Sequence, residues 1–301
     1  RAGRRIHLEL TLDKCRVEIF HKERHYLFNP VRVNAVVDTD GLTQIQATTG
    51  GFGGTMVGSG LSMHGNIDFR VRPVPICDLT MMLYEVDPSS LGFGMNLKDR
   101  MTLLSHFEGP VSRPVGRGVI KMKELHIPAL HFTDVVGSIR YEDGDLRFDD
   151  VSAAVYGGHL LANGTYNLDT RYYRIDGQGA GLRSDQVLPG SGLACAVDLD
   201  IHVESKGGPR QTTFYGSFRS GEGHYRRFPF TYLSGNFYEA YHDLRFSDLN
   251  IQMAAFRIST DALTFKDGKL TLREIRLTDE GGQLLHVLEP PEGRAEGTAA
   301  P

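Results

Sequence analysis

Three acidic pairs are the residues whose types and spacing come closest to catalytic chemistry. They are Glu142-Asp143, Asp149-Asp150 and Asp198/Asp200, and two carboxylates side by side could serve as the acid and base of a glycosidase. Each pair lies at an expected turn or alternates outward from an expected strand, where carboxylates are usually solvated. We therefore expect no catalytic residues, no bound cofactor and no enzymatic activity.

The twelve histidines include no HExxH motif, the helical pattern of many zinc proteases. His21 and His25 lie four apart in "HKERH", an expected turn that offers no evident third ligand. His126 and His131 lie five apart in "LHIPALHF", with Pro128 between them. A single regular strand would place residues five apart on opposite faces, so we expect no metal site.

The cysteines and glycine-rich stretches also favour structural roles. Cys15, Cys77 and Cys195 lie far apart with no zinc-like spacing, so we expect small buried thiols and no disulfide framework. The stretches "GGFGGTMVGSG" at 50–60 and "GQGAGL" at 177–182 do not open a helix after a buried parallel strand, as a nucleotide site requires. "NGT" at 163–165 fits a glycosylation acceptor that matters only in a secreted eukaryotic chain.

Composition and charge indicate a folded chain that does not bind nucleic acid. Hydrophobic residues make up 40% and charged residues 23% of the sequence, which is typical of folded domains. The formal net charge is −4, and the basic cluster "HYRRF" at 224–228 has no wider basic surface around it. No apolar run is long enough for a membrane-spanning helix. The chain opens in strand-like sequence, so we expect a fragment whose signal or anchor lies upstream.

Alternation of apolar and polar residues dominates the chain and predicts β-strands. In "RIHLELTL", at 5–12, every second residue is apolar. The one helical candidate spans 79–107, where Leu79, Met82 and Leu83 have helical spacing and Pro88 breaks the run. We expect a β segment over 1–76, a helical or loop insert over 77–108, a repeated β-meander over 109–288 and a disordered tail over 289–301.

An eleven-residue unit occurs twice. "DLRFDDVSAAV" at 145–155 returns as "DLRFSDLNIQM" at 243–253, an offset of 98 residues (243 − 145). The apolar positions are even before Asp149-Asp150 in the first copy and before Ser247-Asp248 in the second, and odd after them. A slip of one residue would send every later side chain to the opposite face, so we expect a β-bulge at the Asp that restores one common face. "KLTLREIRL" shows a third slip, at Arg273-Glu274.

These units predict a mainly β fold: an elongated, curved antiparallel β-meander sheet that forms an open apolar groove. Asp143-Gly144 is a favoured hairpin pair, and strands of about ten residues that contact only their neighbours give extended bodies. The second copy also places Asn250 and Gln252 on the face opposite its apolar residues, so only one face requires an apolar partner.

The segment "LHIPALHFTDVVGSIRYEDGDLRFDDVSAAVYGGHLLANGTYNLD", at 125–169, resembles the C-terminal repeat region of AsmA-like proteins of the Gram-negative envelope. The segment 214–277 follows a similar order, although Ala254-Ala255 replaces the double glycine. The resemblance covers about half to two thirds of the chain, and the N-terminal third matches only loosely.

This resemblance implies a taco-shaped apolar β groove in the periplasm, tied to the inner membrane by an anchor outside this sequence. Its implied partners are phospholipid acyl chains and outer-membrane components. The lipid-groove candidates on the two repeat units are Leu146, Phe148, Val151, Ala153, Val155, Leu244, Phe246, Leu249, Ile251 and Met253.

Two alternatives share the same β architecture. In the first, the chain is a structural or assembly scaffold of the envelope, and its apolar face serves only as a core. In the second, tyrosines on strands (Tyr172, Tyr173, Tyr225 and Tyr232) make it a carbohydrate-associated repeat protein.

Overall fold

The computed structural model describes residues 7–21, 24–38, 40–54, 57–91, 99–127, 130–207, 209–241, 243–266 and 269–289. The mainly β, antiparallel fold expected from the sequence is confirmed. Close contacts divide the chain into unit 1 (Arg1–Ala153 with Thr165–Asp169) and unit 2 (Ala154–Gly164 with Thr170–Pro301). The tail beyond residue 289 lies outside the described residues.

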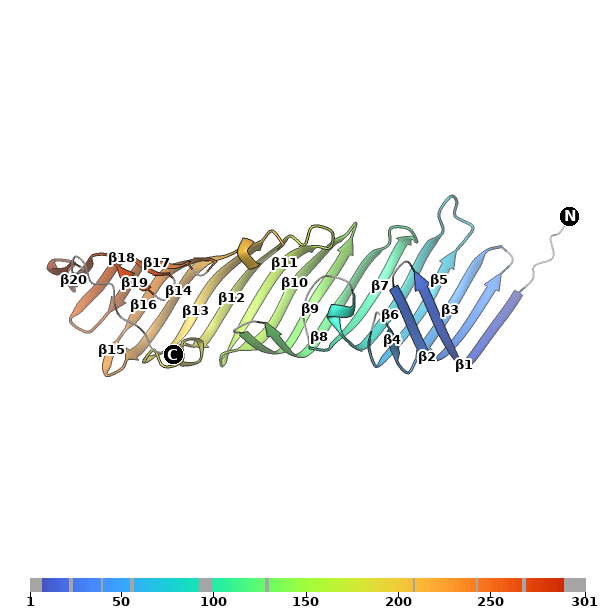
Figure 1. Ribbon diagram of the computed structural model, residues 1–301, viewed down its shortest axis with the longest axis horizontal. Helices are drawn as coiled ribbons and strands as arrows, with labels where there is room; N and C mark the ends of the chain where they lie inside the picture. Colours follow the sequence, from blue (N-terminus) through green and yellow to red (C-terminus); the bar gives the residue numbers. More distant parts are fainter. Residues whose placement is uncertain are drawn as a thin grey trace. The chain divides into compact units, whose positions relative to one another are not determined.

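The strands and short helices follow one another along the chain, and most consecutive strands within each unit lie side by side (Figure 1). Short strands are passed over: β4 pairs with β2, so that β3 pairs with β5. Their bounds are β1 (His7–His21), β2 (Arg24–Asp38), β3 (Leu42–Thr49), β4 (Phe52–Gly54), β5 (Gly60–Asp68), β6 (Ile76–Val86), η1 (Pro88–Leu91), β7 (Met101–Pro110), β8 (Val115–Ile127), β9 (Leu130–Glu142), β10 (Asp145–Val155), β11 (Gly158–Asn167), β12 (Tyr173–Arg183), α1 (Ser184–Val187), β13 (Leu193–Ser205), η2 (Pro209–Gln211), β14 (Thr212–Tyr225), β15 (Phe228–Phe230), β16 (Tyr232–Ala240), β17 (Asp243–Gln252), β18 (Phe256–Lys266), β19 (Lys269–Leu272), β20 (Ile275–Asp279) and β21 (Leu284–Leu288).

The helical insert expected near 79–107 is wrong. Strand β6 covers Leu79, Met82 and Leu83, strand β7 begins at Met101, and the only helical residues described between them form the 3₁₀ turn η1. Leu79 and Leu83 share the face of Leu103 and Phe107 on β7, whereas Met82 pairs with Leu104 on the other face. An apolar residue on the second face of a strand therefore produced the helix-like spacing.

The β-bulge expected in the second repeat unit is confirmed. On β16, Ser234 and Asn236 pair with Asn250 and Ser247 of β17, so Gly235 alone opposes the two residues Asp248 and Leu249. Asp248 has φ +53°, the left-handed conformation that Asp tolerates better than most residues. The side-chain amide of Asn236 donates from Nδ2 to Asp248 Oδ2 at 2.9 Å, and this bond links the bulge to β16.

The first repeat unit has the same backbone feature. Asp150 has φ +52°, and Val151 fills the space above Gly137 of β9, as Leu249 fills the space above Gly235. The expected hairpin at Asp143-Gly144 is also present, with φ +47° and +86°, the two positive values of a type I′ turn.

Bulges of this kind are a general device of the sheet. The register of β1 shifts between Leu12 and Cys15, with Lys14 at φ +52°, and that of β6 shifts between Leu83 and Val86, with Glu85 at φ +48°. In unit 2, β12 shifts between Gly179 and Leu182, with Gly181 at φ +66°. Each bulge inserts one residue and returns the following side chains to the earlier face.

The expectation that Arg273-Glu274 repeats the same bulge is wrong. These two residues fall in the break between β19 and β20, where Leu272 pairs with Leu263 and Ile275 pairs with Thr260 on β18. Both pairs belong to the same register against β18, so the chain from β19 to β20 contains no extra residue opposite β18 and no bulge. Instead, the Arg273 amide donates to the Ala262 carbonyl across the break at 3.1 Å, which continues the pairing without a bulge.

A methyl group at Gly137 should destabilise the protein. An added Cβ would lie 2.5 Å from Val151 Cγ2 and 3.0 Å from Val151 Cα. Neither atom can move easily, because Val is β-branched and restricted in χ1, and Cα is part of the backbone. We expect Gly137→Ala to lower the free energy of unfolding by about 1–3 kcal/mol, measured by urea denaturation. Gly53→Ala is the matched control in unit 1, because its Cβ would meet nothing within 4 Å. Equal midpoints for the two variants would contradict this packing.

Candidate functional site

Unit 1 has one apolar and one polar face, as its strand register shows. The row that starts at Leu12 of β1 continues through Val33, Ala47, Met63, Met81, Ser105, Gly118 and Ile139. The neighbouring row starts at Thr11 and continues through Asn34, Gln46, His64, Thr80, His106, Arg117 and Arg140. Because directly paired residues share a face, apolar and polar side chains separate across eight strands.

Unit 2 separates its side chains in the same way. One row runs from Gly177 of β12 through Ile201, Gly216, Phe237, Phe246 and Leu263. The adjacent row runs from Asp176 through His202, Tyr215, Tyr238, Arg245 and Thr264. We call the sides that carry the first kind of row the apolar faces of the two units, and the opposite sides the polar faces.

The candidates of the first repeat unit follow the expected pattern. Leu146, Ala153 and Val155 are buried, with 3%, 8% and 6% of their surface exposed. Phe148 and Val151 are half-buried, whereas Arg147, Asp150 and Ser152 between them are exposed. Val151 faces Gly137, which pairs with Ile120 on the apolar face.

The candidates of the second repeat unit lie on the apolar face of unit 2, with one exception. Phe246 pairs with Phe237, and Ile251 pairs with Leu233 on the same side of β16. Leu249 lies over Gly235, which belongs to that side, and Leu244 continues the alternation toward the strand end. Met253 lies outside β17, in the turn where its amide donates to the Phe256 carbonyl at 2.9 Å.

Burial along the apolar face of unit 1 is uneven. Its most buried side chains lie on β6 to β9 and include Leu83 and Val135, each 3% exposed. On β1, Leu8 is 59% and Leu10 48% exposed. The apolar face is therefore packed in its middle and accessible along this strand.

A polar hollow of about 590 Å³ lies in the polar face of unit 2, which the sequence reasoning missed. The small residues Ala180, Ser217 and Ser234 form part of its lining, and larger polar side chains surround them. These are Gln178, Asp198, Asp200, Arg219, Tyr232, Asn236, Asp248 and Asn250. The sequence feature that could indicate this hollow is the presence of small polar residues at alternate positions of neighbouring strands, as at Ser217 and Ser234.

A polar ladder crosses three strands beside this hollow. His202 shares a hydrogen bond with the Asp176 carboxylate and stacks on Tyr215, with 5.0 Å between ring centroids. The bond to His202 holds the pKa of Asp176 below its ordinary value, with a smaller contribution from Arg174. His202 and Arg174 thus stabilise the charged form of Asp176. The side chains of Asp176 and His202 remain partly exposed to solvent on the polar face.

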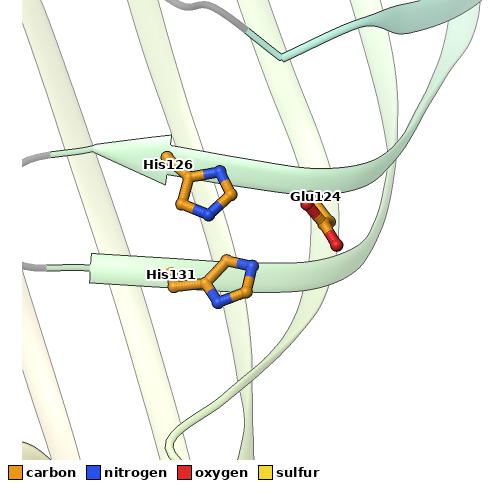
Figure 2. A group of neighbouring side chains, drawn as sticks. All are labelled: Glu124, His126 and His131. Atoms are coloured by element: carbon orange, nitrogen blue, oxygen red, sulfur yellow. The ribbon is translucent and has the colours of Figure 1, made fainter.

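The expectation that His126 and His131 lie on opposite faces is wrong. Strand β8 ends at Ile127 and β9 begins at Leu130, so the two histidines belong to different strands and pair directly across the hairpin. Their rings stack with centroids 4.1 Å apart. Glu124 joins them, and one ligand atom from each of the three side chains lies within 4.8 Å of the others (Figure 2).

The acidic pairs lie where the sequence placed them. Glu142, Asp143, Asp150, Asp198 and Asp200 are exposed. Asp149 accepts a hydrogen bond from Arg147 Nε at 2.9 Å, and Asp198 accepts one from the Gly181 amide at 3.0 Å.

The three cysteines are free thiols. Cys77 is buried, as expected, and burial raises the pKa of its thiol. Cys15 and Cys195 are half-buried, which differs from the expectation for those two.

Comparison with known proteins found no matching family model, no matching curated protein and no matching solved structure. The resemblance to AsmA-like proteins therefore stays a prediction from the sequence. Among the described residues, no helix has the length and apolar character to cross a membrane.

Removing the His202 partner should raise the pKa of Asp176. In the folded protein this pKa is depressed, so the pair stabilises the fold above the ordinary pKa of Asp, about 3.9, and loses that contribution as the pH falls through the folded value. We expect His202→Gln to shift the Asp176 carboxyl titration to higher pH, followed by carbon NMR. Asp185, whose pKa is lowered mainly by Arg183, is the internal control. An unchanged Asp176 titration would contradict this assignment.

Proposed function

We propose that the chain binds phospholipid in the cell envelope through its apolar faces and conducts it between the inner and outer membranes. The observation that carries the proposal is the continuity of the apolar rows. In unit 1 the row through Leu12 crosses eight strands, and in unit 2 the row through Phe246 crosses six. Such a surface suits a long flexible acyl chain better than a compact polar substrate.

The energetics of acyl-chain burial support this function. Each methylene removed from water contributes about 0.8 kcal/mol, so shielding eight of them contributes about 6 kcal/mol before the cost of ordering the chain. The larger side chains in these apolar rows are Leu, Ile, Val, Phe and Met, which offer at most the weak thioether acceptor of Met as a hydrogen-bond partner.

The polar faces complete the arrangement. Carboxylates, amides, Arg and Tyr on these faces interact with water and with one another, as the ladder through Asp176 and His202 illustrates. In each unit, one side of the sheet is thus suited to an aqueous compartment while the other receives lipid. The periplasm, which the resemblance to AsmA-like proteins implies, is such a compartment.

The competing function is an envelope scaffold in which another protein layer covers the apolar faces. Burial on the apolar face of unit 1 supports this function too, because Leu83 and Val135 are each only 3% exposed and so already pack against protein side chains. The two functions differ in what occupies the face: acyl chains that exchange with a membrane in one case, and fixed side chains in the other.

Purified, folded protein should carry phospholipid and take up more from vesicles. We expect organic extracts of the protein to yield phospholipid by mass spectrometry. Incubation with fluorescent vesicles of phosphatidylethanolamine and phosphatidylglycerol should then load the protein. Folded protein that carries no lipid and takes up none would contradict the proposal and favour the scaffold.

Two adjacent residues of β17 provide a matched test of which face acts. Phe246 lies on the apolar face, where its ring meets Phe218 edge-on at 6.1 Å, and Ser247 points to the other side. A buried charge facing acyl chains is unfavourable by several kcal/mol, so we expect Phe246→Glu to lower lipid loading at least tenfold and Ser247→Glu to leave it unchanged. Phe246→Ala removes the same ring without adding a charge, so it separates the effect of the charge from the effect of losing the side chain. Circular dichroism checks that all three variants are folded. Equal loading of the two Glu variants would contradict the assignment of the face.

A further inference from the structure

The end of the β8–β9 hairpin brings three metal-ligating side chains together. His126 and His131 are directly paired across the two strands, and Glu124 precedes His126 by two residues on the same face of β8. All three side chains are exposed, and one ligand atom from each lies within 4.8 Å of the others. Figure 2 shows the two imidazoles and the carboxylate on one side of the hairpin.

Asp99 orients this cluster from the chain segment that precedes β7. Its Oδ2 accepts the His126 amide proton at 2.6 Å, and its Oδ1 lies 3.0 Å from His126 Nδ1. A carboxylate bound to one imidazole nitrogen fixes the ring and its tautomer, which leaves Nε2 to bind a metal, as in carboxylate–histidine–zinc triads.

We propose that Glu124, His126 and His131 form a binding site for a divalent transition metal of the zinc class, oriented by Asp99. Two imidazoles and one carboxylate are a known zinc ligand set, with the fourth tetrahedral position left to water or to a partner's side chain. Ligand atoms around zinc lie about 3.3 Å apart, given zinc–nitrogen distances of about 2.0–2.1 Å. Rotation of the exposed Glu124 and His131 side chains toward the fixed His126 ring can close the present separation.

Two features set this cluster apart from the other exposed acidic groups of the chain. The stacked histidines are held in register by the strand pairing, so their approach does not depend on a flexible loop. The Asp99 clamp also fixes His126 through both its backbone and its ring. Magnesium and calcium prefer all-oxygen sites, so the two imidazoles select against them. The site is independent of the lipid function proposed above.

Titration calorimetry of the full, untagged chain with zinc chloride tests the site. We expect one equivalent of zinc to bind, and magnesium chloride to give no heat of binding. His126→Ala and His131→Ala should each weaken zinc binding at least tenfold. His64→Ala, an exposed histidine of the polar face of the same unit, should leave it unchanged.

Asp99→Asn separates an orienting role from a ligand role. It keeps all three ligands but removes the charged partner of His126, so we expect one equivalent of zinc still to bind, about 10–100-fold more weakly. Circular dichroism confirms that each variant is folded. Absence of stoichiometric zinc binding to the wild-type chain, or binding that survives in both histidine variants, would overturn the proposal.

Discussion

The strict period of two along a β-strand is the constraint on which the rest of the molecule depends. Each side of a strand receives every second residue, so a shift of one position would move all later apolar side chains into water. The alternation shifts by one residue at several places along the chain. At Asp150, Asp248 and Gly181, a residue with positive φ forms a bulge that compensates for the shift. At the second of these, Gly235 makes room for Leu249 opposite the extra residue. The separation of apolar and polar faces follows from this local geometry.

Features that depend on the alternation of apolar and polar residues within one short stretch could be predicted from the sequence. The mainly β antiparallel fold, the Asp143-Gly144 turn and the bulge at Asp248 each depend on a few consecutive residues, and the structure confirms them. The bulge residue is Asp in both repeat units because a short polar side chain tolerates positive φ. The shared face of Leu244, Phe246 and Ile251 follows from the same pattern.

Features that depend on where the chain reverses could not be predicted in the same way. Alternation along "LHIPALHF" as a single strand predicts histidines on opposite faces. The chain reverses between Ile127 and Leu130 instead, so His126 and His131 are stacked neighbours on paired strands. The segment containing Met82 looked helical because an apolar residue also lies on the polar face of β6. The polar hollow of unit 2 required the register of five strands, β12 to β17 without the short β15, which no single stretch of sequence contains.

The central claim is that the apolar face, and not its opposite, contacts lipid. A photoreactive amino acid placed at Ile251 or at Asn250 tests it most directly, because these neighbours on β17 point to opposite sides of the sheet. After incubation with phospholipid vesicles and irradiation, mass spectrometry detects lipid attached to the protein. We predict lipid adducts at position 251 and none above background at position 250. Equal labelling at both positions, or labelling at 250 alone, would contradict the claim.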